Sequence, residues 1–195
     1  MTTISALEGI HIKGLFGDFE KKDEKNLIKI SEKSDLLIVQ IVQYTKSPIS
    51  LESIKIDNLN LKNNTHLVIS NKSTRILWCG PKNWILVSSK KDLLKEIKKK
   101  LNEKDFAITD LSHSKTTIEL EGDNIKEVLK KGCPFDIDQL KKDNCFNSVF
   151  NGLSVTIDIL EDSTNKIRIF TLRSFGESLH HSITDACLEF GYKNI

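Results

Sequence analysis

The chain lacks most of the features that would identify a chemistry or a compartment. Its 195 residues include only four cysteines, at Cys79, Cys133, Cys145 and Cys187, and no two of them form a C-x-x-C pair. The N-terminus has neither the basic start nor the apolar core of a signal peptide. No apolar run approaches the roughly 20 residues that span a bilayer. These absences predict a cytoplasmic protein with reduced thiols and no membrane association.

Neither sign of charge predominates. The 29 basic residues against 27 acidic ones leave a net charge of +2, which is too small for a protein that mainly binds a phosphate backbone. One predicted helix face is rich in lysine, with Lys90, Lys91, Lys95, Lys98, Lys99 and Lys100. Acidic residues interrupt this face, and no aromatic side chains accompany it as stacking platforms. We therefore predict a solvated face and no nucleic-acid partner.

The chain also lacks the spacings of metal and nucleotide sites. Its five histidines are His11, His66, His113, His180 and His181. None is paired at the i, i+4 spacing of a helical zinc site, and no cysteine pair supplies further ligands. Neither G-x-G-x-x-G nor G-x-x-x-x-G-K-[ST] occurs, so no phosphate-cradling loop is expected. We predict neither a metal site nor a cofactor site within this chain.

Two positions suggest chemistry but have simpler interpretations. Cys133 follows a lysine-rich helix end, which favours a thiolate, yet the negative partial charge of a helix C-terminus opposes one. Asp110 lies between two expected strands, where a carboxylate is able to act as a general base or contact a pterin. The alternative is a turn in which Asp110 and Ser112 satisfy backbone N–H groups. We favour the structural interpretation of both positions and predict no catalytic residue.

Hydrophobic periodicity predicts an α+β protein. In the first part we expect a strand at 36–42, a short helix-like turn at 48–56, a hairpin around 79–83, a helix at 92–101 and a strand at 106–109. In the second part we expect a strand at 116–120, a helix around 125–129, strands at 153–159 and 167–172, and a helix at 175–190. Two successive βαββα units predict two tandem ferredoxin-like lobes with antiparallel-rich sheets. These lobes span 34–112 and 113–195 and are rigidly joined.

The first 33 residues are polar and contain the charged run Glu20-Lys21-Lys22-Asp23-Glu24-Lys25. They predict an extended N-terminal arm rather than a domain. Leu15, Phe16 and Phe19 form a group of large apolar side chains just before that run. This group either packs on the core of its own chain or docks into another subunit, which makes it the candidate partner interface.

The closing segment is the best specified part of the sequence. Ser174 is placed to cap a helix, and Glu177, three residues on, completes a capping box. An apolar stripe follows at helical spacing, made of Phe175, Leu179, Ile183, Ala186, Cys187 and Phe190. Gly191 predicts the end of the helix. Cys187 is most simply a small buried hydrophobic residue of this stripe.

Four blocks occur in an order and spacing that carry a family resemblance. They are Leu77–Val87 with its Gly80-Pro81 turn, Asp110-Leu111-Ser112 with Ile118–Gly122, Val128–Ile137, and Arg173-Ser174-Phe175 with the final helix. Together, over about residues 76–191, they resemble the gamma subunit of heterotetrameric sarcosine oxidase. The second block is similar to a segment shared with the aminomethyltransferase superfamily. The resemblance therefore implies lobes like those of aminomethyltransferase-type folate-binding domains.

The resemblance implies a place in a multi-subunit flavoenzyme that oxidatively demethylates sarcosine to glycine and can pass the one-carbon unit to tetrahydrofolate. Alpha, beta and delta subunits are the implied partners. FAD, FMN, NAD and tetrahydrofolate are expected in those partners, and no cofactor is expected in this chain. Its implied role is that of a non-catalytic subunit that stabilises the assembly.

Two other functions stay open at this point. One is a stand-alone folate-binding module related to the aminomethyltransferases, although the chain has about half the length expected for a complete folate site. The other is an adaptor for a different N-methyl amine demethylase. The sequence does not separate that adaptor from a sarcosine oxidase subunit, because the substrate would contact other chains.

Overall fold

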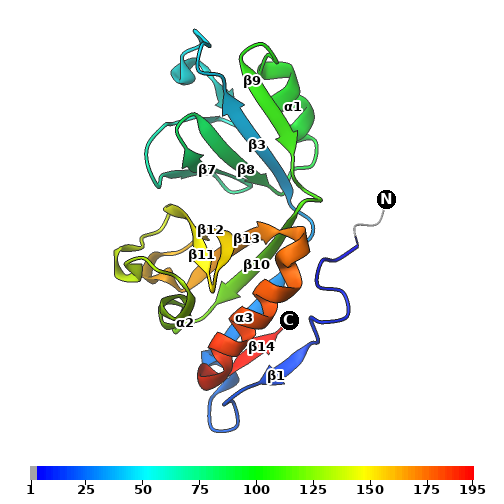
Figure 1. The fold of residues 1–195 in the computed structure, drawn as a ribbon, viewed down its shortest axis with the longest axis vertical. Helices are drawn as coiled ribbons and strands as arrows, with labels where there is room; N and C mark the ends of the chain where they lie inside the picture. Colours follow the sequence, from blue (N-terminus) through cyan, green and yellow to red (C-terminus); the bar gives the residue numbers. More distant parts are fainter. Residues whose placement is uncertain (1–3) are drawn as a thin grey trace. The chain divides into compact units, whose positions relative to one another are not determined.

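The computed structural model describes residues 4–195, which divide into two compact units (Figure 1). The terminal unit contains both ends of the chain: the part up to Ser34, then Ser114–Lys142 and Asn147–Ile195. The central unit contains Asp35–His113 and Asp143–Phe146. The chain therefore enters the central unit from the terminal unit and returns to it, so the terminal unit is discontinuous in sequence.

The central unit is built on a five-stranded sheet in the order β6-β7-β8-β3-β9, with every neighbouring pair antiparallel. The strands of this sheet are β3 (Leu37–Gln43), β6 (Val68–Ser70), β7 (Thr74–Gly80), β8 (Asn83–Ser88) and β9 (Phe106–Asp110). A separate two-stranded sheet is formed by β4 (Lys55–Ile56) and β5 (Leu59–Asn60). Helix α1 (Leu93–Lys100) buries Leu93 and Ile97 in a core that includes Trp84 and Phe106. Burial of this apolar face stabilises a helix of only eight residues, which would be marginal in isolation.

The expected turn of helix at 48–56 is shorter than predicted. Only Leu51–Ser53 forms a 3₁₀ helix, η2, and the hairpin of β4 and β5 follows it. Ile54 and Ile56 are buried and Lys55 is exposed, which is the alternation of a strand and not of a helix. Asp57 and Asn58 connect β4 to β5 with φ values of 48° and 63°, as a two-residue hairpin turn requires.

The terminal unit is built on a seven-stranded sheet in the order β1-β14-β2-β10-β13-β12-β11. Its strands are β1 (Gly14–Phe16), β2 (Ile28–Glu32), β10 (Lys115–Glu121), β11 (Cys145–Phe150), β12 (Leu153–Ile159), β13 (Lys166–Leu172) and β14 (Tyr192–Asn194). Strand β10 pairs antiparallel with β2 and β13, whereas β14 pairs parallel with β2. Helices α2 (Ile125–Gly132) and α3 (Gly176–Cys187) pack against each other, and α3 packs on β10 and β13.

Short 3₁₀ helices connect the strands and helices of the terminal unit. They are η1 (Glu24–Asn26), η3 (Ile137–Gln139), η4 (Asp162–Thr164), η5 (Arg173–Phe175) and η6 (Leu188–Phe190). The described part of the molecule is therefore a mixed α+β protein with antiparallel-rich sheets, which confirms the predicted fold class. The order β10-α2-β12-β13-α3 follows the expected βαββα pattern, with β11 added. In the central unit, all of which is described, α1 is the only α-helix.

The N-terminal segment differs from the expected arm. Strand β2 lies inside the sheet, between β14 and β10, and β1 pairs with β14 at the sheet edge. Leu27, Ile28 and Ile30 are at most 1% exposed, because this short apolar run fills a core position after the charged turn. Of the predicted arm, residues 4–33 thus belong to the same unit as the second predicted lobe, residues 1–3 lie outside the described residues, and Asp143–Phe146 belong to the central unit.

The closing helix keeps its apolar stripe but not its predicted cap. Leu179, Ile183 and Cys187 are fully buried, as the spacing predicted. Ser174 lies instead within η5, and α3 begins after Phe175 with no side-chain hydrogen bond at its N-cap. The capping-box prediction is therefore wrong. The 3₁₀ turn η5 begins at Arg173, two residues before the first helical position that a Ser174 cap would give.

A substitution at Gly17 tests whether the N-terminal segment packs closely against the rest of the terminal unit. Its φ is +73°, and a Cβ there would lie 2.4 Å from the carbonyl oxygen of Leu188. Gly17→Ala is expected to lower the free energy of unfolding by about 1–3 kcal/mol through overpacking, in addition to backbone strain. Urea unfolding of the full chain measures this loss.

Gly152→Ala is the matched control. Gly152 has a φ of +82° with nothing within 4 Å of the added Cβ, so only the left-handed strain of about 1–2 kcal/mol applies. Equal stability of the two variants would contradict the close packing of the N-terminal turn against η6.

Candidate partner interface

The predicted interface residues lie at and just after the edge strand β1 (Figure 1). Phe16 stacks on Tyr192 of β14, with ring centroids 5.3 Å apart and an interplanar angle of 22°. Phe16 and Phe19 are half-buried, whereas Leu15 is 37% exposed. Phe16 thus packs on its own chain, and Leu15 is the residue of this group that presents a large apolar side chain to solvent.

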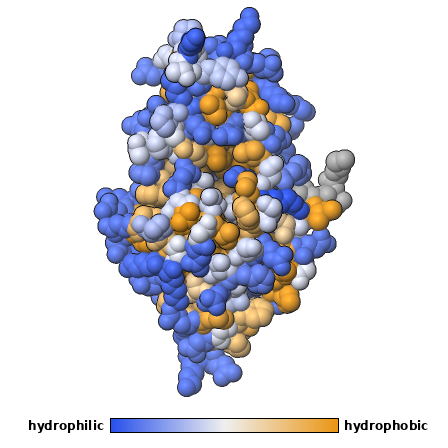
Figure 2. Space-filling model, viewed as in Figure 1, coloured by the Kyte–Doolittle hydropathy of each residue, from blue (hydrophilic) through white to orange (hydrophobic). Residues whose placement is uncertain are grey.

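Further large apolar side chains are exposed, and most belong to the terminal unit. Among residues 4–195 these side chains are Ile4, Ile12, Leu15, Tyr44, Leu172, Phe175, Leu188 and Ile195. All of them except Tyr44 lie in the terminal unit. Figure 2 shows apolar side chains at the surface among hydrophilic ones on the face it presents. Exposed apolar side chains mark a site of protein–protein contact where they adjoin one another.

Hydrogen bonds join segments that carry some of these residues and lie far apart in the sequence. Arg173 of η5 donates from Nη2 to the carbonyl oxygen of Ile4 at 2.7 Å, which attaches the Ile4 backbone to the segment that leads into α3. The backbone N–H of Asp18 donates to the carbonyl oxygen of Leu188 at 2.8 Å. The turn after β1 therefore lies against η6, and exposed leucines flank that junction on both segments.

Asp110 and Ser112 form the turn that the sequence favoured. Asp110 Oδ1 accepts from the Ser112 N–H at 2.9 Å and from its hydroxyl at 2.6 Å. Ser112 Oγ in turn accepts from the N–H of Ile38 at 3.0 Å. Burial opposes ionisation of Asp110, but the hydrogen bonds from Ser112 outweigh it and lower its pKa. The carboxylate is thus engaged in holding β9 to β3, which makes it a weaker base than usual.

Cys133, considered as a possible thiolate, and Cys187, expected in the apolar stripe, are both buried thiols. Cys133 caps the C-terminal end of α2, and burial raises its pKa to about 11. Burial raises the pKa of Cys187 to about 12, although Lys131 acts in the opposite direction. Both groups remain protonated at neutral pH, which confirms the structural interpretation of each.

The histidines are distributed over both units. His66 stacks on Phe146 with ring centroids 4.4 Å apart, and its Nδ1 lies 3.1 Å from the carbonyl oxygen of Cys145. His11 and His180 lie 5.4 Å apart between ring centroids, a contact that sequence reasoning missed because 169 positions separate them. Within the described residues, no group of three or more His, Cys, Asp or Glu side chains is arranged to hold a metal ion.

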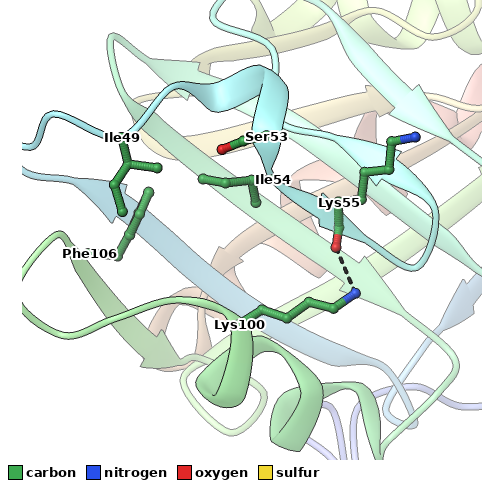
Figure 3. Close-up of a pocket in the computed structure, with 6 residues that line it drawn as sticks. All are labelled: Ile49, Ser53, Ile54, Lys55, Lys100 and Phe106. Carbon is green, nitrogen blue, oxygen red and sulfur yellow. Dashed lines mark hydrogen bonds between the residues drawn. The ribbon is translucent and has the colours of Figure 1, made fainter.

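A recess of about 440 Å³ in the central unit is shown in Figure 3. It is lined by Ile49, Ser53, Ile54, Lys55, Lys100 and Phe106. The ammonium of Lys100 donates to the carbonyl oxygen of Lys55 at 2.8 Å and to Glu96 Oε1 at 2.6 Å. The cation at the recess is thus already paired, and these lining residues supply neither a nucleophile with a base nor a carboxylate pair.

A network of charges lies on the outer face of β2, β10 and β13. Glu119 is 8% exposed and accepts from Arg168 Nη2 at 2.7 Å, with Lys33 and Lys166 each at 3.6 Å. Burial opposes its ionisation, but Arg168 and the two lysines outweigh burial and lower the pKa of Glu119. Opposite charges on neighbouring strands fix the register of the sheet, so this network is structural.

No helix among the described residues is long and apolar enough to cross a membrane.

The fold itself resembles two solved structures at low sequence identity. A chain of heterotetrameric sarcosine oxidase from Corynebacterium sp. U-96, in complex with pyrrole 2-carboxylate, matches with a TM-score of 0.75 and 22% identity, over 86% of this chain and 87% of that one. Aminomethyltransferase T of the glycine cleavage system from Bartonella henselae matches with a TM-score of 0.60 and 11% identity, over 82% and 46%. These two likenesses define the class of fold.

The sequence comparison then gives the family. The model of the sarcosine oxidase, gamma subunit family matches residues 53–189, and the chain belongs to this family. Sarcosine oxidase subunit gamma from Corynebacterium sp. (strain U-96) is 29% identical over 120 residues, which is 60% of this chain. The aligned part spans 58% of that relative's length. The family resemblance read from the four sequence blocks is confirmed.

Arg168 provides a test of the charge network. Arg168→Met removes the closest partner of the buried Glu119 carboxylate, and we expect a loss of about 1.5–3 kcal/mol in the free energy of unfolding. The double variant Glu119→Leu/Arg168→Met removes both charges and is expected to recover most of that loss. Thermal or urea unfolding measures both changes. A single variant as stable as the native chain would contradict a structural role for the pair.

Proposed function

We propose that this chain is a non-catalytic gamma subunit of a heterotetrameric sarcosine oxidase and that it stabilises the assembly by binding the other subunits. The observation that carries the proposal is the exposed apolar side chains of the terminal unit, found in a member of the gamma subunit family. The partners proposed are the alpha, beta and delta subunits. FAD, FMN, NAD and tetrahydrofolate belong to those partners in this proposal.

The chemistry of the assembly is the oxidative demethylation of sarcosine to glycine, with the one-carbon unit passed to tetrahydrofolate. The candidate groups of this chain are engaged elsewhere: Asp110 in a turn, Cys133 and Cys187 in the core. Their arrangement supports a subunit that contributes surface and leaves redox chemistry to the flavins of its partners.

The exposed side chains supply a physical reason for binding. Full burial of a leucine, isoleucine or phenylalanine side chain stabilises a complex by about 1.5–3 kcal/mol. Obligate interfaces commonly bury about 2,000 Å² or more, so the apolar residues named here would form one part of a larger contact. The Leu15 side chain has no hydrogen-bonding group or charge that would oppose its transfer into such a contact.

The proposal is tested by recovering a tagged form of this chain from its native cells. We expect large partner subunits in the mass spectrum and the visible absorbance of flavin in the purified complex. Bleaching of that absorbance by sarcosine, but not by other N-methyl amines, would identify the substrate. A chain that emerges alone and colourless would contradict the subunit assignment.

A stand-alone folate-binding module is the second candidate function, which has to be distinguished from the proposed sarcosine oxidase subunit. The fold likeness to aminomethyltransferase T supports a related scaffold, but this chain covers only 46% of that structure. Tight binding of tetrahydrofolate to the purified chain alone would favour the module. Bleaching by dimethylglycine or a related amine in place of sarcosine would favour an adaptor for a different demethylase.

Leu15→Asp is the sharpest single test of the proposed interface. It places a charge on the most exposed residue of the N-terminal apolar group, and we expect at least a tenfold loss of affinity for the partner subunits, or about 1.4 kcal/mol. Tyr44→Asp, at the exposed apolar residue of the central unit, is the matched control. Titration of the labelled chain with partner subunits measures both, and equal affinities of the two variants would exclude Leu15 from the interface.

A further inference from the structure

Two histidines in contact, the half-buried His11 and the buried His180, join the N-terminal segment to the last helix. His180 of α3 is 3% exposed, and neither of its ring nitrogens has a hydrogen-bond partner among the described residues. His11 packs against it at 5.4 Å between ring centroids, and the Nε2 of His11 is also buried without a partner there. Three imidazole nitrogens are therefore out of contact with water at one place in the fold.

The segment that carries His11, residues 4–13, is attached to the terminal unit at several points. We call this segment the strap. The Ala6 N–H donates to Glu32 Oε1 at 3.0 Å, and Leu7 is 1% exposed. Arg173 binds the carbonyl oxygen of Ile4 at 2.7 Å, and Asn194 Nδ2 donates to that of Ile12 at 3.1 Å. The strap thus contacts β2, η5 and β14, and His11 is its contact with α3.

The arrangement favours the neutral state of both rings. A charge on His180 would be buried without a hydrogen-bond partner among the described residues, and charges on both rings would repel each other. Burial first, then His11 and His181, lower the pKa of His180 to about 4. Burial is also the largest influence that lowers the pKa of His11.

The surrounding charges do not remove this penalty. Glu32 of β2 and the carbonyl of Ile30 favour a proton on His11, whereas Lys13 opposes it. His181 lies on α3 beside Glu177, at 3.7 Å. From α2, Lys131 is directed to Glu189 and the Ala186 carbonyl at the other end of α3. The charges of β10 and β13, such as Glu119 and Arg168, pair on the opposite face of the sheet.

We propose that the strap is an acid-released element, docked on α3 while His11 and His180 are both neutral and detached when either ring is protonated. The detached state exposes the two imidazoles and the site that Leu7 fills. Detachment leaves β1 and the rest of the sheet in place, because β1 is held separately by β14.

The direction of the pH dependence follows from proton linkage. An exposed imidazole has a pKa of about 6.5, so the detached state takes up protons that the docked state excludes. The docked state is therefore most favoured above about pH 6.5, and its equilibrium population decreases as the pH falls toward 4. Each ring shifts the equilibrium by at most about tenfold per pH unit.

Cleavage after Glu8 by a glutamate-specific protease reports detachment directly. Glu8 lies within the strap and precedes Gly9. The rate for the full chain is divided by the rate for a free peptide of residues 4–13, which corrects for the pH dependence of the protease. We expect this ratio to rise about twofold from pH 7.5 to 6.5 and about tenfold further by pH 5, while near-ultraviolet circular dichroism shows that the sheet units stay folded.

Matched variants separate the histidine pair from general acid effects. His180→Phe keeps a ring of similar shape and is expected to remove the larger part of the rise, leaving only the part due to His11, whereas His181→Gln, at the exposed neighbour, is expected to retain the full rise. If His180→Phe does not fold, nuclear magnetic resonance titration of the native rings decides instead. A ratio independent of pH, or ring pKa values near 6.5 for both His11 and His180, would overturn the proposal.

Discussion

The insertion of β2 between β14 and β10 is the constraint on which the terminal unit depends. Ile28 and Ile30 of β2 are fully buried, and the strand pairs parallel with β14 and antiparallel with β10. Both ends of the chain are thereby held in one sheet. The edge strand β1, the strap and the start of α3 take their positions from this pairing. The candidate partner interface is contributed by the N-terminal and C-terminal parts of the chain, and β2 holds these two parts in fixed positions.

Local pattern was sufficient where neighbouring residues determine the structure. The hairpin of β7 and β8, helix α1 and the buried stripe of α3 follow from alternation, turn residues and helical spacing that are visible in the sequence. The strand β2 was not recognised because five residues after a strongly charged run give a weak signal. Its partners, β10 and β14, lie far away in sequence, and only tertiary pairing makes the run a strand.

Two incorrect predictions about helical segments have related causes. Ile54 and Ile56 were assigned to a helical turn because short apolar runs fit either period, and burial of alternate residues decided for a strand. Ser174 and Glu177 have the spacing of a capping box, but η5 already directs the chain into α3, so the serine side chain is not needed there. Local capping preferences are small enough for tertiary packing to override them.

The candidate interface was only partly accessible to sequence reasoning. Leu15, Phe16 and Phe19 were identified as a group, yet their different exposures depend on the pairing of β1 with β14. His11 and His180 meet only in the folded chain, as do Arg173 and the carbonyl oxygen of Ile4. Exposure and long-range contact are properties of the whole fold, so no local pattern encodes them.

Catalysis by the assembly with and without this chain tests the account most directly. The remaining subunits would be purified alone, their mass and flavin content determined, and sarcosine turnover measured per flavin before and after the chain is added. The account predicts unchanged turnover per flavin in the intact remainder, but faster dissociation and inactivation on dilution or warming, which the added chain reverses. A loss of turnover in a remainder of full mass and flavin content would contradict it, because the chain would then take part in the chemistry.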